Sequence, residues 1–169
     1  MALNAYLVRP ATLADEAAVN GVLSRSYPAL LAAHYDADLL ARALPLMVRA
    51  NPKLLASGTY HVACEADGTM LGCGGWTPER PGTGEIVSGL GHLRHFGVDP
   101  GATRRGVGAR LLAHCIAEAE ARGVREIECY ATLSAAPFYQ SAGFVTIGPI
   151  DVDMGGVLFP SLVMKRMHG

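Results

Sequence analysis

Apolar and polar positions follow two different periods in the first half of the chain. A short apolar run at residues 6–8 predicts a strand, and Thr12 followed three residues later by Asp15 is typical of a helix N-terminus. Apolar residues then recur at helical spacing through Leu23, and again over residues 37–55, where prolines indicate breaks. The pattern predicts one strand followed by two helices.

Alternating apolar segments dominate the second half. Residues 60–64 and 70–73 flank an Asp67-Gly68 turn, which predicts a β-hairpin, and the glycine-rich residues 79–91 are predicted to form a loop. Further elements are predicted in this order: strand 93–98, helix 107–122, strand 124–131, helix 135–141, and strands 144–153 and 157–167. The order βααβββαβαββ is that of a mixed α/β or α+β domain.

Composition limits the classes of protein that fit. The 169 residues are 50% apolar, which predicts one domain over residues 1–169 with its own core. A net charge of -1 gives no support to a nucleic-acid partner or an anionic membrane, and no apolar run is long enough for a membrane span. Four widely spaced cysteines without metal-ligand spacing predict buried thiols and no metal site. Because the first ten residues also lack signal-peptide features, we expect a cytoplasmic protein.

The segment Asp-Pro-Gly-Ala-Thr-Arg-Arg-Gly-Val-Gly-Ala at residues 99–109 joins a predicted strand to a predicted helix. Gly106 and Gly108 allow close approach of a ligand to the backbone, and the N–H groups of the helix start favour an anion. The segment lacks the Lys-Ser/Thr of a P-loop, and Leu111 replaces the third glycine of a dinucleotide-binding turn. The turn therefore predicts a phosphate site of another kind.

These residues resemble motif A of the GNAT acyltransferase superfamily, written Q/R-x-x-G-x-G/A. Residues 134–144, Ser-Ala-Ala-Pro-Phe-Tyr-Gln-Ser-Ala-Gly-Phe, are similar to a second family motif, N-x-x-A-x-x-F-Y-x-x-x-G-F, and residues 9–15 resemble the family's first strand and helix. Thr103 stands at the Q/R position and Arg104 where glycine is frequent, which shifts the predicted phosphate contacts towards backbone amides. The resemblance spans nearly the whole chain.

The resemblance implies a fold, a donor and a binding site. The fold is a central, mostly antiparallel sheet of about seven strands flanked by about four helices, splayed between the fourth and fifth strands. The acyl donor is acetyl-CoA, with no metal. The implied cofactor-binding residues are Phe96, Gly97, Val98, Thr103, Arg104, Arg105, Gly106, Val107, Gly108, Ala109, Ser134, Phe138 and Tyr139.

Candidate catalytic residues come from the same motifs. Tyr139 matches the family tyrosine near the CoA sulfur and is predicted to be the general acid; the alternative is an aromatic anchor beneath the cofactor. Strand period places His92 on one face with Arg94, Phe96 and Val98 and places His95 on the other, unless a bulge resets the register. His92 is the preferred general base, with a hydrogen-bonded structural histidine as the alternative.

Other polar or aromatic residues have simpler interpretations. Glu65 and Glu85 are expected to be solvated charges, although either carboxylate could act as a base. Trp76 could line the acceptor pocket or anchor the core. The helical stripe Arg110, His114, Glu118 and Arg122 is most simply a solvated face, with Arg110 a possible contact to the CoA 3'-phosphate.

The resulting hypothesis is transfer of an acetyl group from acetyl-CoA to a primary amine, expected on a small molecule, by direct attack in a ternary complex. The alternatives are acetylation of a protein N-terminus or lysine, and a non-catalytic acyl-CoA-binding sensor or scaffold. The closing apolar strand at residues 157–164 could support a homodimer.

Overall fold

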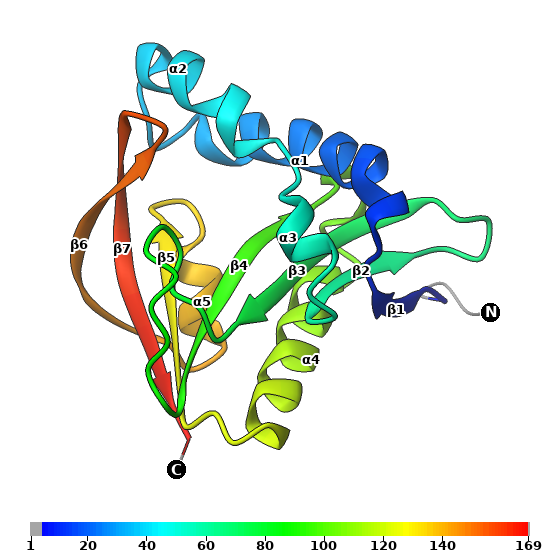
Figure 1. Cartoon of the computed structure of the whole chain (residues 1–169). Coiled ribbons are helices and arrows are strands. Elements are labelled where there is room, and N and C mark those ends of the chain that lie inside the picture. Colours follow the sequence, from blue (N-terminus) through cyan, green and yellow to red (C-terminus); the bar gives the residue numbers. More distant parts are fainter. Residues whose placement is uncertain (1–4, 169) are drawn as a thin grey trace.

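A seven-stranded sheet forms the centre of the computed structural model, which describes residues 5–168 (Figure 1). The strands lie in the order β1-β2-β3-β4-β5-β7-β6, and only the β4–β5 pair is parallel. Their bounds are β1 Leu7–Pro10, β2 Tyr60–Cys64, β3 Met70–Thr77, β4 Leu90–Val98, β5 Glu126–Thr132, β6 Val145–Met154 and β7 Val157–Met167. The predicted mostly antiparallel α+β architecture is confirmed.

Helices cover both faces of the sheet (Figure 1). Three precede β2: α1 Glu16–Leu31, α2 Ala37–Met47 and α3 Pro52–Leu55. The helical stretch predicted over residues 37–55 is divided into α2 and α3, with the second helix starting at Pro52, one of the prolines that indicated breaks. The residue before a proline is biased towards extended backbone, and Asn51 is extended before Pro52 and caps α3 through its side chain. Pro45, by contrast, lies inside α2 without ending it.

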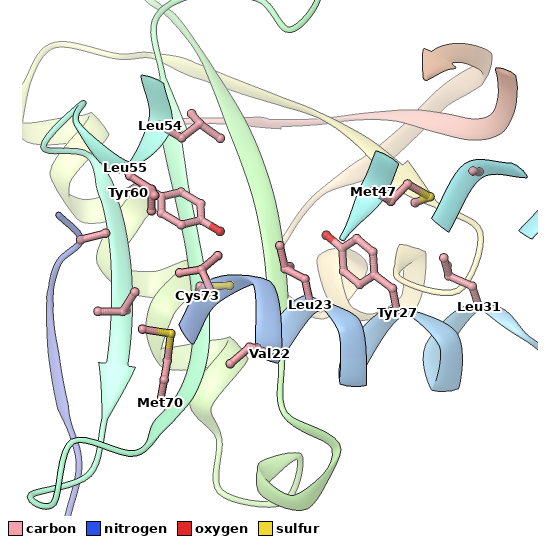
Figure 2. Close-up of a cluster of buried hydrophobic side chains, with 14 of the residues drawn as sticks. Val22, Leu23, Tyr27, Leu31, Met47, Leu54, Leu55, Tyr60, Met70 and Cys73 are labelled. Carbon is pink, nitrogen blue, oxygen red and sulfur yellow. The ribbon is translucent and has the colours of Figure 1, made fainter. Parts of the chain in front are cut away.

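The apolar residues of α1 pack on one face of the sheet. Leu23, Tyr27 and Leu31 of α1 belong to one buried cluster with Tyr60 and Cys73 from the strands. Figure 2 shows Leu23 on the side of Cys73 and Leu31 further along the helix, towards Met47 of α2. On the opposite face lies α4, Val107–Ala121, whose buried residues include Leu111, Leu112 and Cys115. The short helix α5, Ala136–Ser141, joins the core on the α4 side. These two layers hold the sheet between them.

The middle of the sheet is irregular in two ways. Strand β4 pairs with β5 only from Leu90 to His92, so the two strands diverge beyond that point, as the resemblance implied. On its other side, β4 contains a bulge, because Cys73 pairs with Gly97 and Gly75 pairs with Arg94. Two residues of β4 thus oppose one residue of β3.

The pairing with β5 also lengthens β4. Strand β4 begins at Leu90, three residues before the predicted start, because Leu90 and Gly91 pair with β5. The loop before it contains one isolated bridge, between Glu79 and Ile86.

Among residues 5–168, every helix is too short or too polar to cross a lipid bilayer.

Candidate active site

A cavity of about 580 Å³ opens where β4 and β5 diverge. Its lining includes side chains of α1, the second half of β4, the start of α4, β5 and α5. The structure brings together in this lining the following residues of the predicted site: Phe96, Gly97, Val98, Thr103, Gly106, Gly108, Ala109, Ser134, Phe138 and Tyr139. Its volume is typical of a small-molecule or cofactor site.

The glycine turn at the start of α4 forms one wall. Gly106 is the N-cap of the helix and has a left-handed backbone, with φ of 69°, which glycine adopts without steric cost. A Cβ atom at Gly108 would lie 3.3 Å from both Phe138 and Val98. Because the first N–H groups of a helix have no partner within it, they face the ligand side as free donors. The turn therefore fits a pyrophosphate group.

The residue between the two glycines, Val107, is part of the hydrophobic core. Val107, which the resemblance placed among the cofactor-binding residues, is 1% exposed and packs in a cluster with Leu111 and Ala63. Its side chain is therefore part of the core, and only its backbone is available to a ligand.

The arginines of the turn differ in their surroundings. Arg104 is exposed, whereas the Arg105 guanidinium forms an ion pair with Glu65 and lies 5.6 Å from the centre of the Tyr6 ring. Arg110 donates to the Tyr6 carbonyl oxygen at 2.9 Å. Neither Arg104 nor Arg105 lines the cavity, and Glu65 is a structural partner rather than an isolated solvated charge.

Asp99 fixes the position of the turn relative to α1. Its carboxylate accepts from the Gly101 N–H at 3.0 Å and from Arg25 Nε at 2.7 Å. The backbone hydrogen bond and the arginine lower the pKa of Asp99 below its ordinary value. This carboxylate therefore stays ionised and keeps the segment before α4 attached to α1.

Tyr139 lies at the base of the cavity among aromatic rings. Its ring contacts Phe138 at 5.1 Å, Phe144 at 5.6 Å and Phe96 at 6.4 Å between ring centroids. Burial raises the pKa of Tyr139 well above its ordinary value, so its phenol is protonated at neutral pH.

The Tyr139 hydroxyl also differs from those of the other buried tyrosines. Hydroxyl groups of Tyr27, Tyr35 and Tyr60 donate to the backbone carbonyls of Phe96, Pro160 and His95 at 2.8, 2.7 and 2.7 Å. The Tyr139 hydroxyl has no hydrogen-bond partner among residues 5–168 and is not among the fully buried unpaired atoms, so it opens on the cavity that its ring lines. A buried tyrosine hydroxyl ordinarily finds a partner.

The bulge in β4 decides where the two strand histidines point. His95 has a left-handed backbone, with φ of 55°, and its ring lies beside Tyr27 of α1. Phe96 and Val98 pack on the α4 side. The expectation that His92 shares a face with Phe96 and Val98 was wrong, because the bulge adds one residue between them.

His95, rather than His92, lines the cavity. Its Nε2 lies 2.6 Å from the Met47 carbonyl oxygen, and burial lowers its pKa. His92 is 2% exposed, and its Nδ1 lies 3.7 Å from a carboxylate oxygen of Glu128 while its Nε2 has no partner. Burial lowers the pKa of His92, and Glu128 opposes that shift. Both imidazoles are therefore neutral at pH 7.

Glu128 is a buried carboxylate that sequence reasoning missed. It is 5% exposed on β5, directly opposite His92, with Lys165 Nζ at 3.7 Å and Arg80 Nε at 4.0 Å. The next residue but one, Tyr130, lines the cavity. No local pattern marks Glu128, because its partners come from three separate segments of the chain.

Ser134 lines the cavity at the exposed end of the second motif. Its hydroxyl and Nδ1 of His34 are 2.8 Å apart, so the loop after α1 meets the loop after β5 at this point. Leu133 N donates to the Tyr35 hydroxyl at 2.8 Å in the same place.

Trp76 and Glu85 lie outside the cavity lining and contact other protein side chains. Trp76 is 3% exposed and packs on the α4 side, away from the cavity, with its indole N–H donating to Glu118 at 2.8 Å. Glu118 is therefore not part of a purely solvated face. Glu85 lies 3.3 Å from Arg80 in the loop before β4.

The splayed sheet and the glycine turn at the start of α4 form the arrangement that the resemblance to the GNAT superfamily implied. Residues 38–164 match the Acetyltransferase (GNAT) domain family, and the chain belongs to this family. GNAT enzymes are N-acetyltransferases that use acetyl-CoA as the donor. No curated protein matches the sequence.

Solved structures agree with this assignment. A GCN5-related N-acetyltransferase from Kribbella flavida is 30% identical over 97% of this chain and 98% of that chain, with a TM-score of 0.63. A GCN5-related N-acetyltransferase from Rhodopseudomonas palustris is 21% identical over 99% of each chain, with a TM-score of 0.77. PaiA N-acetyltransferase from Thermoplasma acidophilum, solved in complex with coenzyme A, is 17% identical over 97% of this chain and 99% of that chain, with a TM-score of 0.70.

Proposed function

We propose that the chain, as a single domain over residues 1–169, transfers the acetyl group of acetyl-CoA to a primary amine of a small molecule. The observation that carries the proposal is the unpaired Tyr139 hydroxyl in the cavity, beside the glycine turn. A cavity of about 580 Å³ suits a small acceptor beside the end of the pantetheine arm.

The donor is held mainly by backbone groups. The Arg105 N–H already donates to the Ala102 carbonyl oxygen at 3.1 Å, so the pyrophosphate is bound by the other backbone amides of the turn, chiefly those of residues 106–109 at the start of α4. Arg104 supplies positive charge from the exposed side of the turn. Phe96, Gly97 and Val98 lie past the last β4–β5 pair, so this edge of β4, apart from the Phe96 carbonyl oxygen that accepts from Tyr27, is available to pair with the pantetheine arm as an added strand would. Ser134 and Phe138 contact the donor from the opposite wall.

The reaction is direct aminolysis of the thioester in a ternary complex. The neutral amine nitrogen forms a bond to the acetyl carbon while the carbon–sulfur bond breaks. Tyr139 donates its proton to the leaving thiolate, and the proton lost from the amine nitrogen passes to His92 through water. His92 does not itself line the cavity, so the relay requires water between His92 and the acceptor. Its Nε2 has no partner, and Glu128 favours the protonated imidazole.

The His92 assignment has its own test. We expect His92→Gln to lower kcat/KM and to remove the acidic limb of its pH profile, whereas the wild-type limb lies below about pH 6.5 because burial lowers the pKa. An acidic limb that persists in His92→Gln would remove His92 from the mechanism.

Two properties of the whole protein complete the proposal. Exposed apolar residues on the closing strands, including Val145 at 61%, Ile147 at 59% and Leu158 at 59%, support a homodimer through this edge of the sheet. All four cysteines are buried free thiols, which supports a cytoplasmic location. Light scattering during size-exclusion chromatography tests the dimer: a mass of one chain at micromolar concentration would reject it.

The central experiment mixes the protein with acetyl-CoA and a panel of small primary amines and follows release of free thiol. We expect turnover with at least one small amine and a higher melting temperature with acetyl-CoA alone. Turnover only with peptides would replace the small acceptor by a protein N-terminus or lysine. Stabilisation by acetyl-CoA without turnover on any amine or peptide would favour a non-catalytic sensor or scaffold.

A further inference from the structure

Three side chains with metal-binding atoms meet on the α4 side of the sheet, outside the cavity. They are His61 of β2 and His114 and Glu118 of α4, and one ligand atom from each lies within 4.8 Å of the other two. His61 Nε2 and a carboxylate oxygen of Glu118 are 3.0 Å apart, and the two imidazole ring centres are 4.3 Å apart. None of the three lines the cavity between β4 and β5.

The secondary structure holds these residues in place. His114 and Glu118 are four positions apart on α4, so they lie on the same side of the helix. His61 is fixed in β2 by pairing with Pro10 on one side and Gly74 on the other. The site is therefore built from rigid elements, with no loop residue among its candidate ligands.

Exposure changes across the cluster. His61 is 1% exposed, Glu118 is half-buried and His114 is exposed. Apart from its contact with Glu118, the His61 ring has no hydrogen bond to the described residues, and its Nδ1 is buried without a partner. The cluster thus has a buried floor and a solvent-facing rim through which an ion can enter.

We propose that His61, His114 and Glu118 bind one Zn²⁺ ion, with water as the fourth ligand. Two imidazole nitrogens and one carboxylate oxygen form a donor set that suits Zn²⁺. Bonds of about 2.0–2.1 Å in a tetrahedron place ligand atoms about 3.3 Å apart. The His61–Glu118 distance of 3.0 Å is close to this spacing. The ligand atoms lie within 4.8 Å of one another, and rotation of the exposed His114 side chain brings its nitrogen to the required distance from the other two.

Neighbouring groups orient the carboxylate. The indole N–H of Trp76 donates to the same Glu118 oxygen that faces His61, at 2.8 Å, and leaves that oxygen a second lone pair. Arg122 lies 4.0 Å from the other oxygen. These contacts hold the carboxylate with one oxygen towards the two histidines.

Such an ion joins β2 to α4 and stabilises the folded chain without taking part in acetyl transfer. His114 follows the first residue of α4 by seven positions, about 10 Å along the helix axis. The metal site is thus separate from the glycine turn, and its test is independent of the proposed acetyltransferase activity.

The test uses the full chain, with any affinity tag removed and metal stripped by a chelator, in a calorimetric titration with ZnCl₂. We expect one saturable site per chain and a melting temperature that rises with free Zn²⁺. His114→Gln removes the exposed ligand without disturbing the core and should weaken binding at least tenfold. The matched control, His168→Gln, removes a histidine outside the cluster and should leave the affinity unchanged.

A spectroscopic measurement supplies a second criterion. Co²⁺ bound to the wild-type chain should give the visible absorption bands of a four-coordinate ion, and Glu118→Gln should abolish them. Absence of saturable one-to-one binding, or equal affinity of His114→Gln and the wild type, would overturn the proposal. Loss of binding in His168→Gln would overturn it as well, because the ligands would then lie elsewhere.

Discussion

Replacing Tyr139 by phenylalanine tests whether the Tyr139 hydroxyl is catalytic or structural. The hydroxyl makes no hydrogen bond to residues 5–168, so Tyr139→Phe removes an unpaired polar group from a buried ring. Because the hydroxyl opens on the cavity, where water can satisfy it, the free energy of unfolding of the variant should stay within about 1 kcal/mol of the wild-type value. Loss of general-acid catalysis should lower kcat by roughly 10²–10⁴-fold, or about 2.7–5.4 kcal/mol in activation free energy.

Tyr35→Phe is the matched control. Its hydroxyl donates to Pro160 O at 2.7 Å and accepts from Leu133 N at 2.8 Å, so the variant leaves two backbone groups unpaired. We expect a loss of about 1–3 kcal/mol in the free energy of unfolding, or roughly 2–4 °C per kcal/mol in Tm. Its kcat should stay within a few-fold of the wild-type value.

Thermal melts with and without acetyl-CoA, together with thiol release at saturating acetyl-CoA, measure both effects. Wild-type kcat should not fall as the pH rises to about 10, because burial keeps the Tyr139 phenol protonated beyond its ordinary pKa. An unchanged kcat in Tyr139→Phe would refute the assignment. A drop in Tm like that of Tyr35→Phe would show that the hydroxyl has a structural partner.

Three further predictions concern residues around the cavity. Gly108→Val adds atoms beyond a Cβ that would already lie 3.3 Å from Phe138 and Val98, so we expect the apo Tm to fall and the Tm shift caused by acetyl-CoA to disappear; a retained shift would contradict the fitted turn. Gly74→Ala places a Cβ 2.5 Å from the Phe96 ring and should lower the free energy of unfolding in urea by about 1–3 kcal/mol. Adding Phe96→Leu should restore part of this loss; if the losses of the two single variants simply add in the double variant, the contact is contradicted. Burial lowers the pKa of His95, so the folded state binds fewer protons than the unfolded state and its stability falls as the pH drops below about 6.5. His95→Asn, which tolerates the left-handed backbone, should reduce the stability difference between pH 7.5 and 5.5, and an unchanged difference would refute the shift.

Sequence periodicity predicted the elements whose residues interact locally. The helix predicted over residues 107–122 is observed as Val107–Ala121, and the closing strand predicted over residues 157–167 is observed as Val157–Met167. The order of strands in the sheet could not be derived in this way, because β7 inserts between β5 and β6 through long-range pairing. The break between α2 and α3 depends on the cap at Asn51, which outweighs the apolar pattern that continues across it.

The candidate site likewise contains features that the local sequence predicts and features that depend on residues far away in the chain. The left-handed backbone at Gly106 follows from a glycine at the end of a loop, and the motif containing Phe138 and Tyr139 placed those two rings in the cavity. The bulge at His95 depends on a missing side chain across the strand at Gly74, which no residue of β4 reveals. Arg105 was expected at the ligand, but its partner Glu65 comes from 40 positions away in the sequence.

The divergence of β4 from β5 has a consequence for how this protein can change over evolutionary time. The cavity is shaped by main-chain features: two strands that separate after His92, a bulge at His95 and a left-handed turn at Gly106. Most side chains can be exchanged without altering such features, and the fold is shared with proteins of 17–30% identity. Side chains that line the cavity can therefore change, and with them the molecules that fit it, without altering the main-chain frame around it.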